Sequence, residues 1–182
     1  MIDKLKRNLS PQLYYHGAHH TQDVLNAVKL IAAAENTKEE DLFLLKVAAL
    51  YHDSGFLSAY KNHEDISCQI AREDLPEFGL SEQEIDIICG MIQATRIPQQ
   101  PKTPLENIIS DADMEYLGPD EFDRISNNLF KEVKIYLNIP NQHERDKIQV
   151  SFLSQHHYYT DFCRKNREPE KQKHLNEVKA RL

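Results

Sequence analysis

The stretch Ala48-Ala49-Leu50-Tyr51-His52-Asp53-Ser54-Gly55-Phe56 closes a long apolar run with a histidine and an aspartate side by side. The run begins near Leu42 and is apolar nearly all round, which is typical of a helix buried on every side. Burying the Asp53 carboxylate without a partner is costly. A bound divalent cation would supply the missing charge and take both polar side chains as ligands.

Several residues mark where the expected helices begin and end. Thr37 and Glu40 have the spacing of a capping box and predict the start of the helix that leads to His52. Gly55 is expected to stop that helix. Ser81 and Glu84 form a second capping box, so another helix is expected to begin there.

The helical period of 3.6 residues runs through most of the chain. Apolar residues recur at this spacing in the segments 16–31, 63–70, 85–95, 105–116 and 122–133. His63, Ile66 and Ile70 are expected to share the inner face of their helix. No alternating apolar and polar run is long enough for a strand.

The C-terminal part of the chain is also expected to be helical. Gly118 is expected to end one helix, and Pro119 suits the first turn of the next. Two more helices are predicted at about 142–165 and 168–181. We therefore expect residues 1–182 to form a single all-α domain of about seven to nine helices.

Composition narrows the function classes. The chain has 182 residues and a net charge of −7, which argues against binding to nucleic-acid polymers or acidic membranes. The three cysteines form no CxxC motif, so neither a disulfide framework nor a cysteine-type zinc site is expected. No apolar leader or membrane-spanning stretch is apparent, and a reducing, cytoplasmic location fits best. The nine histidines are the first functional indication.

Two further segments supply candidate metal ligands. His20 continues the apolar stripe of the first helix, and Asp111 and Asp113 interrupt the stripe of 105–116. At 100° per residue, Asp113 lies roughly 80° from the centre of that stripe and Asp111 roughly 120°. Asp113 is therefore the expected ligand, and Asp111 either supports the ligands or is solvated. Two histidines and two aspartates suit one Mn²⁺, Fe²⁺, Zn²⁺, Ni²⁺ or, less well, Mg²⁺ ion.

These residues fall in three ordered motifs: Tyr15-His16-Gly17-Ala18-His19-His20-Thr21-Gln22-Asp23-Val24, the stretch 48–56, and Asp111-Ala112-Asp113-Met114-Glu115-Tyr116-Leu117-Gly118. Over about residues 12–125 the chain resembles the HD superfamily of metal-dependent phosphohydrolases. The first motif is similar to one found in cyclic-nucleotide phosphodiesterases. The C-terminal helices, about 126–182, would pack on this core.

The resemblance implies an all-α fold, hydrolysis of a phosphate ester and one divalent metal ion. It assigns the ion to His20, His52, Asp53 and Asp113. Members of this superfamily that bind two metals usually carry further histidines between the His-Asp pair and the last aspartate. Here Gln93 stands at a position where such a histidine would be expected, so one tightly bound metal is favoured. A second, weaker metal bridged by Asp53 stays open.

The catalytic roles follow from the same resemblance and from ordinary chemistry. His16 would be the general acid that protonates the leaving oxygen, against the alternative of a helix-start histidine bonded to backbone. Asp53 could orient the attacking water as well as bind the metal. His63 would be a ligand or a substrate contact, or simply a satisfied histidine at a helix start. Glu64 is expected to support the ligands.

Other residues are weaker candidates for substrate binding. Lys61 could meet a phosphate but is more simply read as solvated. Thr95 and Arg96 could contact a phosphoryl group, or Arg96 could be a cation placed at a helix C-terminus. His156 and Tyr159, on a face with Phe152 and Cys163, could belong to a lid, although an aromatic core stripe beside a solvated basic face is favoured.

The sequence thus predicts a metal-dependent phosphohydrolase that acts on a small phosphate ester, with a nucleotide or cyclic nucleotide favoured. One alternative is a regulatory module that binds a nucleotide without turnover. Another is a di-iron oxygenase on the same scaffold, which would require additional histidine ligands. The metal, the exact substrate and assembly into a homo-oligomer are left open.

Overall fold

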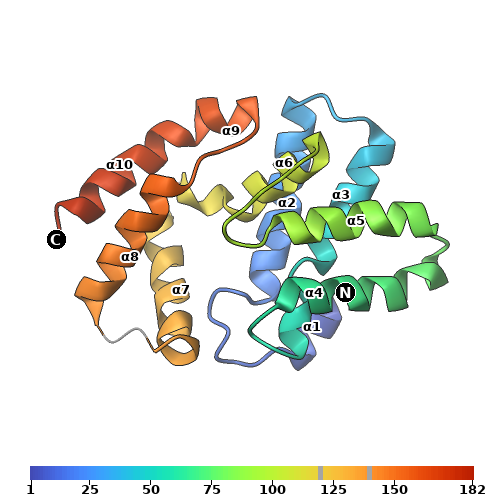
Figure 1. Ribbon diagram of the computed structural model, residues 1–182, viewed down its shortest axis with the longest axis horizontal. Coiled ribbons are helices and arrows are strands. Elements are labelled where there is room, and N and C mark those ends of the chain that lie inside the picture. The colour runs from blue at the N-terminus through green and yellow to red at the C-terminus, as the bar shows by residue number, and fades with distance from the viewer. Residues whose placement is uncertain (119–120, 139–140) are drawn as a thin grey trace.

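Helices α2, α3, α5 and α6 form the centre of the fold, as the computed structural model shows (Figure 1). It describes residues 1–118, 121–138 and 141–182, which contain ten α-helices, three 3-10 helices and no strand. The elements are α1 (Ile2–Asn8), α2 (Ala18–Ala34), α3 (Glu39–Tyr51), η1 (Ser54–Leu57), α4 (His63–Asp74), η2 (Leu75–Phe78), α5 (Glu82–Ala94), α6 (Pro104–Asp113), η3 (Glu115–Leu117), α7 (Phe122–Tyr136), α8 (Gln142–Gln155), α9 (Asp161–Asn166) and α10 (Glu168–Lys179).

The predicted all-α fold is confirmed, and its core comes from the apolar stripes of the sequence. Val28, Leu45, Ile88 and Ile109, one from each central helix, are fully buried. Burial of such aliphatic side chains is the main favourable contribution to folding. Helix α3 is buried over most of its surface, as expected, although Phe43 is exposed. None of the helices in the described ranges has the length and hydropathy of a transmembrane helix.

Helices α7 to α10 lie together on the side of the molecule away from α3, α4 and α5 (Figure 1). Helix α8 packs along α10, and η3 joins this group to α6. Leu153, Tyr158, Leu175 and Val178 are buried here and belong to the same hydrophobic cluster as the central helices. The three cysteines are free, as expected.

Two helix boundaries differ from their predicted signals. Helix α3 starts after Lys38 with no side-chain cap, so the capping box predicted at Thr37 and Glu40 is wrong. Gly55 does not stop α3, which already ends at Tyr51, but lies inside η1. Its small size is needed for another reason, because a Cβ there would lie 2.0 Å from the carbonyl oxygen of His63. The capping box predicted at Ser81 is confirmed.

The inner face of α4 is shifted by one residue from the predicted one. Glu64, Ser67 and Ala71 are buried, whereas His63, Ile66 and Ile70 are only half-buried. The apolar residues of this helix are few, and a buried glutamate and serine take the place of two of them. The sequence pattern therefore pointed to the wrong face.

The other differences lie after α6. That helix ends at Asp113, and the rest of the predicted 105–116 helix forms η3. The predicted helix 142–165 is two helices, because α8 ends at Gln155 and residues 156–160 are not helical. This break, together with α1, gives one helix more than the upper end of the expected range. The expectation for Pro119 lies outside the described residues.

Candidate metal centre

The ends of three helices bring two imidazoles and a carboxylate together in the interior. His20 lies in the first turn of α2, His52 caps the end of α3, and Asp113 is the last residue of α6. The Nε2 atom of His20 lies 3.0 Å from Oδ1 of Asp113 and 3.5 Å from Nε2 of His52. Nε2 of His52 lies 3.6 Å from the same carboxylate oxygen. All three side chains are buried, and their donor atoms are close enough to share one metal ion.

Asp53 adds a second carboxylate beside this cluster. Its Oδ2 atom lies 3.3 Å from Nε2 of His52 and 3.6 Å from Nε2 of His20. That oxygen is buried and has no hydrogen-bond partner in the described part of the chain. A buried carboxylate oxygen without a hydrogen bond is unfavourable unless a cation compensates it. The four side chains therefore fit a divalent metal ion.

The turn that carries His52 is held by backbone and by α4. Nδ1 of His52 lies 2.9 Å from the carbonyl oxygen of Ala49, which can only accept, so Nδ1 is the donor and Nε2 is directed at the cluster. The hydroxyl of Ser67 donates to the His52 carbonyl (2.7 Å) and accepts from the Gly55 amide (2.8 Å). No sequence motif indicates this role for Ser67.

The histidines and carboxylates of the cluster shift each other's pKa values. Burial lowers the pKa of His52, but the carboxylates of Asp53 and Asp113 outweigh burial and raise this pKa to about 9. Burial raises the pKa of Asp53, and the neighbouring His52, His16 and His20 together hold it well below its usual range. The cluster thus stabilises ionised carboxylates that lie next to a positive charge.

Asp111 takes a different place from the one expected. It is fully buried, and its carboxylate accepts hydrogen bonds from the backbone amides of Tyr159 (2.9 Å) and Thr160 (2.8 Å) and from the Thr160 hydroxyl (2.6 Å). Among the described residues it therefore forms no hydrogen bond with a metal-centre side chain, and it does not face solvent. Instead it fastens the non-helical segment between α8 and α9 to α6.

His16 lies one turn before His20 and forms a hydrogen-bonded ion pair with Glu132, a residue that no sequence motif singled out. Nδ1 of His16 contacts Oε1 of Glu132, and Oε2 of Glu132 accepts from the amides of Tyr15 (2.9 Å) and His16 (3.1 Å). Burial lowers the pKa of His16, but the hydrogen bond that His16 donates to Glu132 and the charges of nearby carboxylates give a net rise in this pKa. Glu132 is fully buried on α7. Asp113 is a candidate because it is an acidic residue next to an apolar helical stripe. Glu132 meets the same criterion in the stripe of 122–133.

His63 and Glu64 extend the cluster on its α4 side. Nε2 of His63 lies 3.6 Å from Oδ1 of Asp53 and 3.6 Å from Oε1 of Glu64. Arg96 reaches the same place, with Nε 3.6 Å from Oε2 of Glu64 and Nη2 2.8 Å from Asp65. A polar chain thus leads outward from Asp53 to the half-exposed Arg96.

The other predicted substrate contacts are spread more widely. Lys61 is exposed, and the Thr95 hydroxyl donates to the Ile92 carbonyl at the end of α5 (2.8 Å). The side-chain hydroxyl of Tyr159 donates to the Gln99 carbonyl (3.0 Å). In the described part of the chain, none of these three side chains forms a hydrogen bond or an ion pair with the metal-centre side chains.

His156 lies apart from the cluster as well. Its carbonyl accepts a hydrogen bond from Lys171, which is itself buried. Burial and the Lys171 charge lower the pKa of His156 to about 3. The expected face shared by Phe152, His156, Tyr159 and Cys163 is wrong, because the helix breaks at His156 and the basic residue beside it is buried rather than solvated.

Known proteins resemble the chain in sequence and in fold. The family model of the HD domain matches residues 17–115, more than half of the chain and the part that contains all four cluster residues. No curated protein matches. A crystal structure described as a predicted HD superfamily hydrolase, from an uncultured Thermotogales bacterium, matches with a TM-score of 0.66 and 18% identity, over 98% of this chain and 87% of that one. At this identity the likeness concerns the fold. The arrangement of helices and the family match together show that the chain belongs to the HD domain family.

Proposed function

We propose that the protein is a metal-dependent phosphohydrolase that uses water to cleave a small phosphate ester. The observation that carries the proposal is the unsatisfied Oδ2 of Asp53, which faces two imidazoles beside a third, paired histidine. His20, His52, Asp53 and Asp113 would hold one divalent ion. When bound, such an ion lowers the pKa of a coordinated water and polarises a phosphoryl oxygen.

The residues of the chain supply the rest of the chemistry. Asp53 has its second oxygen, Oδ1, free of the imidazole pair and 3.6 Å from His63, so it can orient the attacking water. His16 acts as general acid. Its Nδ1 is occupied by Glu132, which leaves Nε2–H to protonate the ester oxygen while the P–O bond breaks and the water oxygen bonds to phosphorus.

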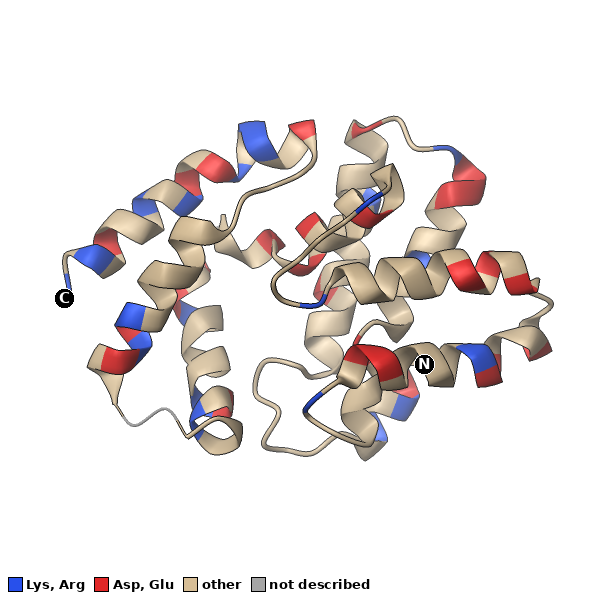
Figure 2. Cartoon of the chain, in the orientation of Figure 1, with Lys and Arg blue, Asp and Glu red and all other residues tan. Residues whose placement is uncertain are grey.

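A small-molecule substrate fits the surface better than a polymer does. Along α9 and α10, Lys and Arg alternate with Asp and Glu (Figure 2), and the chain carries a net charge of −7. A nucleic-acid site is normally a basic stripe or patch. The first motif resembles that of cyclic-nucleotide phosphodiesterases, so nucleotides and cyclic nucleotides are the first compounds to test.

Elemental analysis followed by a hydrolysis screen tests this function. The screen follows inorganic phosphate for phosphomonoesters and the ring-opened monophosphate for cyclic nucleotides. We expect one divalent metal per chain and hydrolysis that stops on chelation and returns with Mn²⁺. Hydrolysis that persists in metal-stripped protein contradicts the proposal. Nucleotide binding without hydrolysis of any phosphate ester bond would replace it with a regulatory role, and two iron ions per chain would replace it with oxygenase chemistry.

A further inference from the structure

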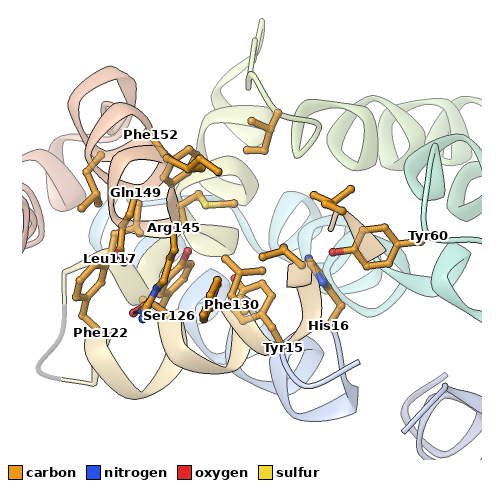
Figure 3. A pocket seen from close by; sticks show the side chains of 18 residues that line it. Tyr15, His16, Tyr60, Leu117, Phe122, Ser126, Phe130, Arg145, Gln149 and Phe152 are labelled. Carbon is orange, nitrogen blue, oxygen red and sulfur yellow. Dashed lines mark hydrogen bonds between the residues drawn. The ribbon is translucent and has the colours of Figure 1, made fainter. Parts of the chain in front are cut away.

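A cavity of about 350 Å³ lies between α7, α8 and the η3 region and is separate from the four metal-centre side chains (Figure 3). Fourteen of its eighteen lining residues are aliphatic or aromatic. His16 and Tyr60 lie toward one end of it, so the cavity begins at the general acid of the proposed reaction. Its volume falls in the range of pockets that hold small ligands.

The rim of the cavity is apolar as well. Ile97, Leu137 and Ile148 line it and are each about half exposed, at 51%, 50% and 51%. An apolar ligand that covers these side chains removes hydrophobic surface from water. Along the apolar wall, a sugar would bury hydroxyl groups against aliphatic and aromatic carbon atoms that cannot accept hydrogen bonds, which is unfavourable. The lining therefore selects an apolar body over a ribose.

Arg145 is the exception in this lining. It is 8% exposed, and it forms no ion pair with any acid in the described ranges. Its hydrogen bonds go to the neutral acceptors Asn127 (2.8 Å), Gln142 (3.3 Å) and Ser126 (3.2 Å), which leaves two of the five guanidinium N–H donors without an acceptor among the residues that the structure describes.

Arg145 therefore lacks an ion-pair partner among the described residues. Burial lowers its pKa, and although Asp146 and Asp123 oppose this shift, neither forms an ion pair with it. The Cζ atom of its guanidinium lies over the Phe130 ring, 5.0 Å from the ring centre, and this cation–π contact holds the group at the cavity wall. A buried cation without a counter-charge is unfavourable, and a bound anion would relieve it.

Gln149 adds a second unsatisfied group in the same region. Its Oε1 atom is buried and has no hydrogen-bond partner among the described residues, and the side chain lines the cavity. Figure 3 shows Ser126, Arg145 and Gln149 gathered away from His16 and Tyr60, with Phe130 and Tyr15 between the two groups. The cavity thus has a polar corner and a long apolar wall.

We propose that this cavity binds the organic part of the substrate, an aryl or alkyl body that carries one acidic group. The acidic group pairs with Arg145, the apolar body lies along Phe130 and Val133, and the phosphate ester faces His16. The orientation of the ester rests on the proposed function. Binding of the body and its acidic group does not require turnover, so the two can be tested apart.

Binding is measured first, on metal-free protein, with the fluorescent probe 8-anilinonaphthalene-1-sulfonate, an aromatic body with one acidic group. We expect saturable binding of one probe per chain. Arg145→Met should weaken it by about tenfold or more, as expected for a lost hydrogen bond to a charged group. Arg72→Met, which removes an exposed arginine of α4, is the matched control and should bind as the wild type does.

A second variant protects this test against a folding defect. Val133→Trp fills the cavity from α7 and should abolish probe binding, and the melting temperatures of all variants show whether they are folded. Equal probe affinity in wild type, Arg145→Met and Val133→Trp would overturn the proposal.

Turnover then tests the substrate class with Mn²⁺ present. We expect kcat/KM to rise from methyl phosphate to phenyl phosphate to 4-carboxyphenyl phosphate. The ratio between the last two should fall about tenfold in Arg145→Met and stay at the wild-type value in Arg72→Met. If probe binding depends on Arg145 but no phosphate is released, the proposed function fails and the cavity assignment stands. If nucleotides are the best substrates and Arg145→Met leaves probe binding unchanged, the cavity assignment fails and the proposed function stands.

Discussion

Two buried carboxylates of α6, two residues apart, have opposite surroundings. Asp111 accepts hydrogen bonds from Tyr159 and Thr160 and is satisfied by the protein itself. Asp113 faces His20 and His52, beside Asp53, whose Oδ2 has no hydrogen-bond partner in the described chain. Burying a negative charge is unfavourable at both positions. Hydrogen-bond donors of the protein offset this at Asp111, whereas at Asp113 a bound cation would offset it together with the neighbouring imidazoles. The fold itself satisfies the Asp111 carboxylate, whereas the Asp113 carboxylate lies in the cluster that we propose holds a metal ion.

The largest effect is expected from Asp53→Asn. Loss of one anionic ligand weakens metal binding and removes several kcal/mol of transition-state stabilisation, so kcat/KM should fall by roughly 10³-fold or more. Metal content after gel filtration and steady-state kinetics measure the two effects. Asp123→Asn, at an exposed position on α7, is the control and should change neither. An Asp53→Asn protein that keeps its metal and its rate would show that the unsatisfied oxygen is not a ligand.

Glu132 lies between the two types, because it is buried and hydrogen-bonded but also holds His16. Glu132→Gln should lower kcat by roughly 10²-fold, the usual contribution of a general acid. The pKa of His16 is raised mainly through Glu132, so the active, protonated form is lost as pH rises through that pKa. Removing the negative charge lowers this pKa, and the alkaline limb of the pH–rate profile should move to lower pH.

The control for this prediction is Glu121→Gln, an exposed glutamate just before α7. It should leave both the rate and the pH profile unchanged. A Glu132→Gln enzyme with a reduced rate but an unmoved alkaline limb would mean that Glu132 only supports the fold around Tyr15 and His16.

Asp111→Asn should affect stability rather than chemistry. An amide has one acceptor oxygen, so at least one buried donor of residues 159–160 loses its partner, at a cost of about 1–3 kcal/mol. For a chain of this size, each kcal/mol lowers the melting temperature by about 2–4 °C. Metal content should stay at the wild-type level. Metal loss greater than that of Asp53→Asn would reverse the comparison between the two carboxylates.

The sequence revealed these sites unequally, and the reasons are physical. His52 and Asp53 stood out because polar residues ended an apolar run, and the helical angle favoured Asp113 over Asp111. The structure places these side chains together; that they hold a metal is still a proposal. The break at His156 left no local signal, since no glycine or proline stands in residues 156–160 and Asp111, far away in sequence, fastens the segment.

The cavity was hidden for a related reason. The apolar spacing of residues 122–133 predicts one apolar face on this helix, and in the structure Leu129 and Val133 of that face line the cavity together with residues of α8. Periodicity shows that a face is apolar, and it does not show whether protein or ligand covers that face. Arg145 and Gln149 reveal the difference only when their burial and their missing partners are known.

The smallest expected effect concerns two helix N-terminal hydroxyls, those of Ser81 and Thr37. Both residues have the capping-box spacing in the sequence. Ser81 accepts a hydrogen bond from the Glu84 amide, whereas α3 has no side-chain cap near Thr37. Ser81→Ala should therefore cost about 1 kcal/mol, and Thr37→Ala should cost little. Chemical denaturation of the two variants measures both values, and neither change should alter activity, because both positions lie away from the metal centre. Equal destabilisation would mean that the spacing of the motif matters more than the hydrogen bond that the structure shows at Ser81 alone.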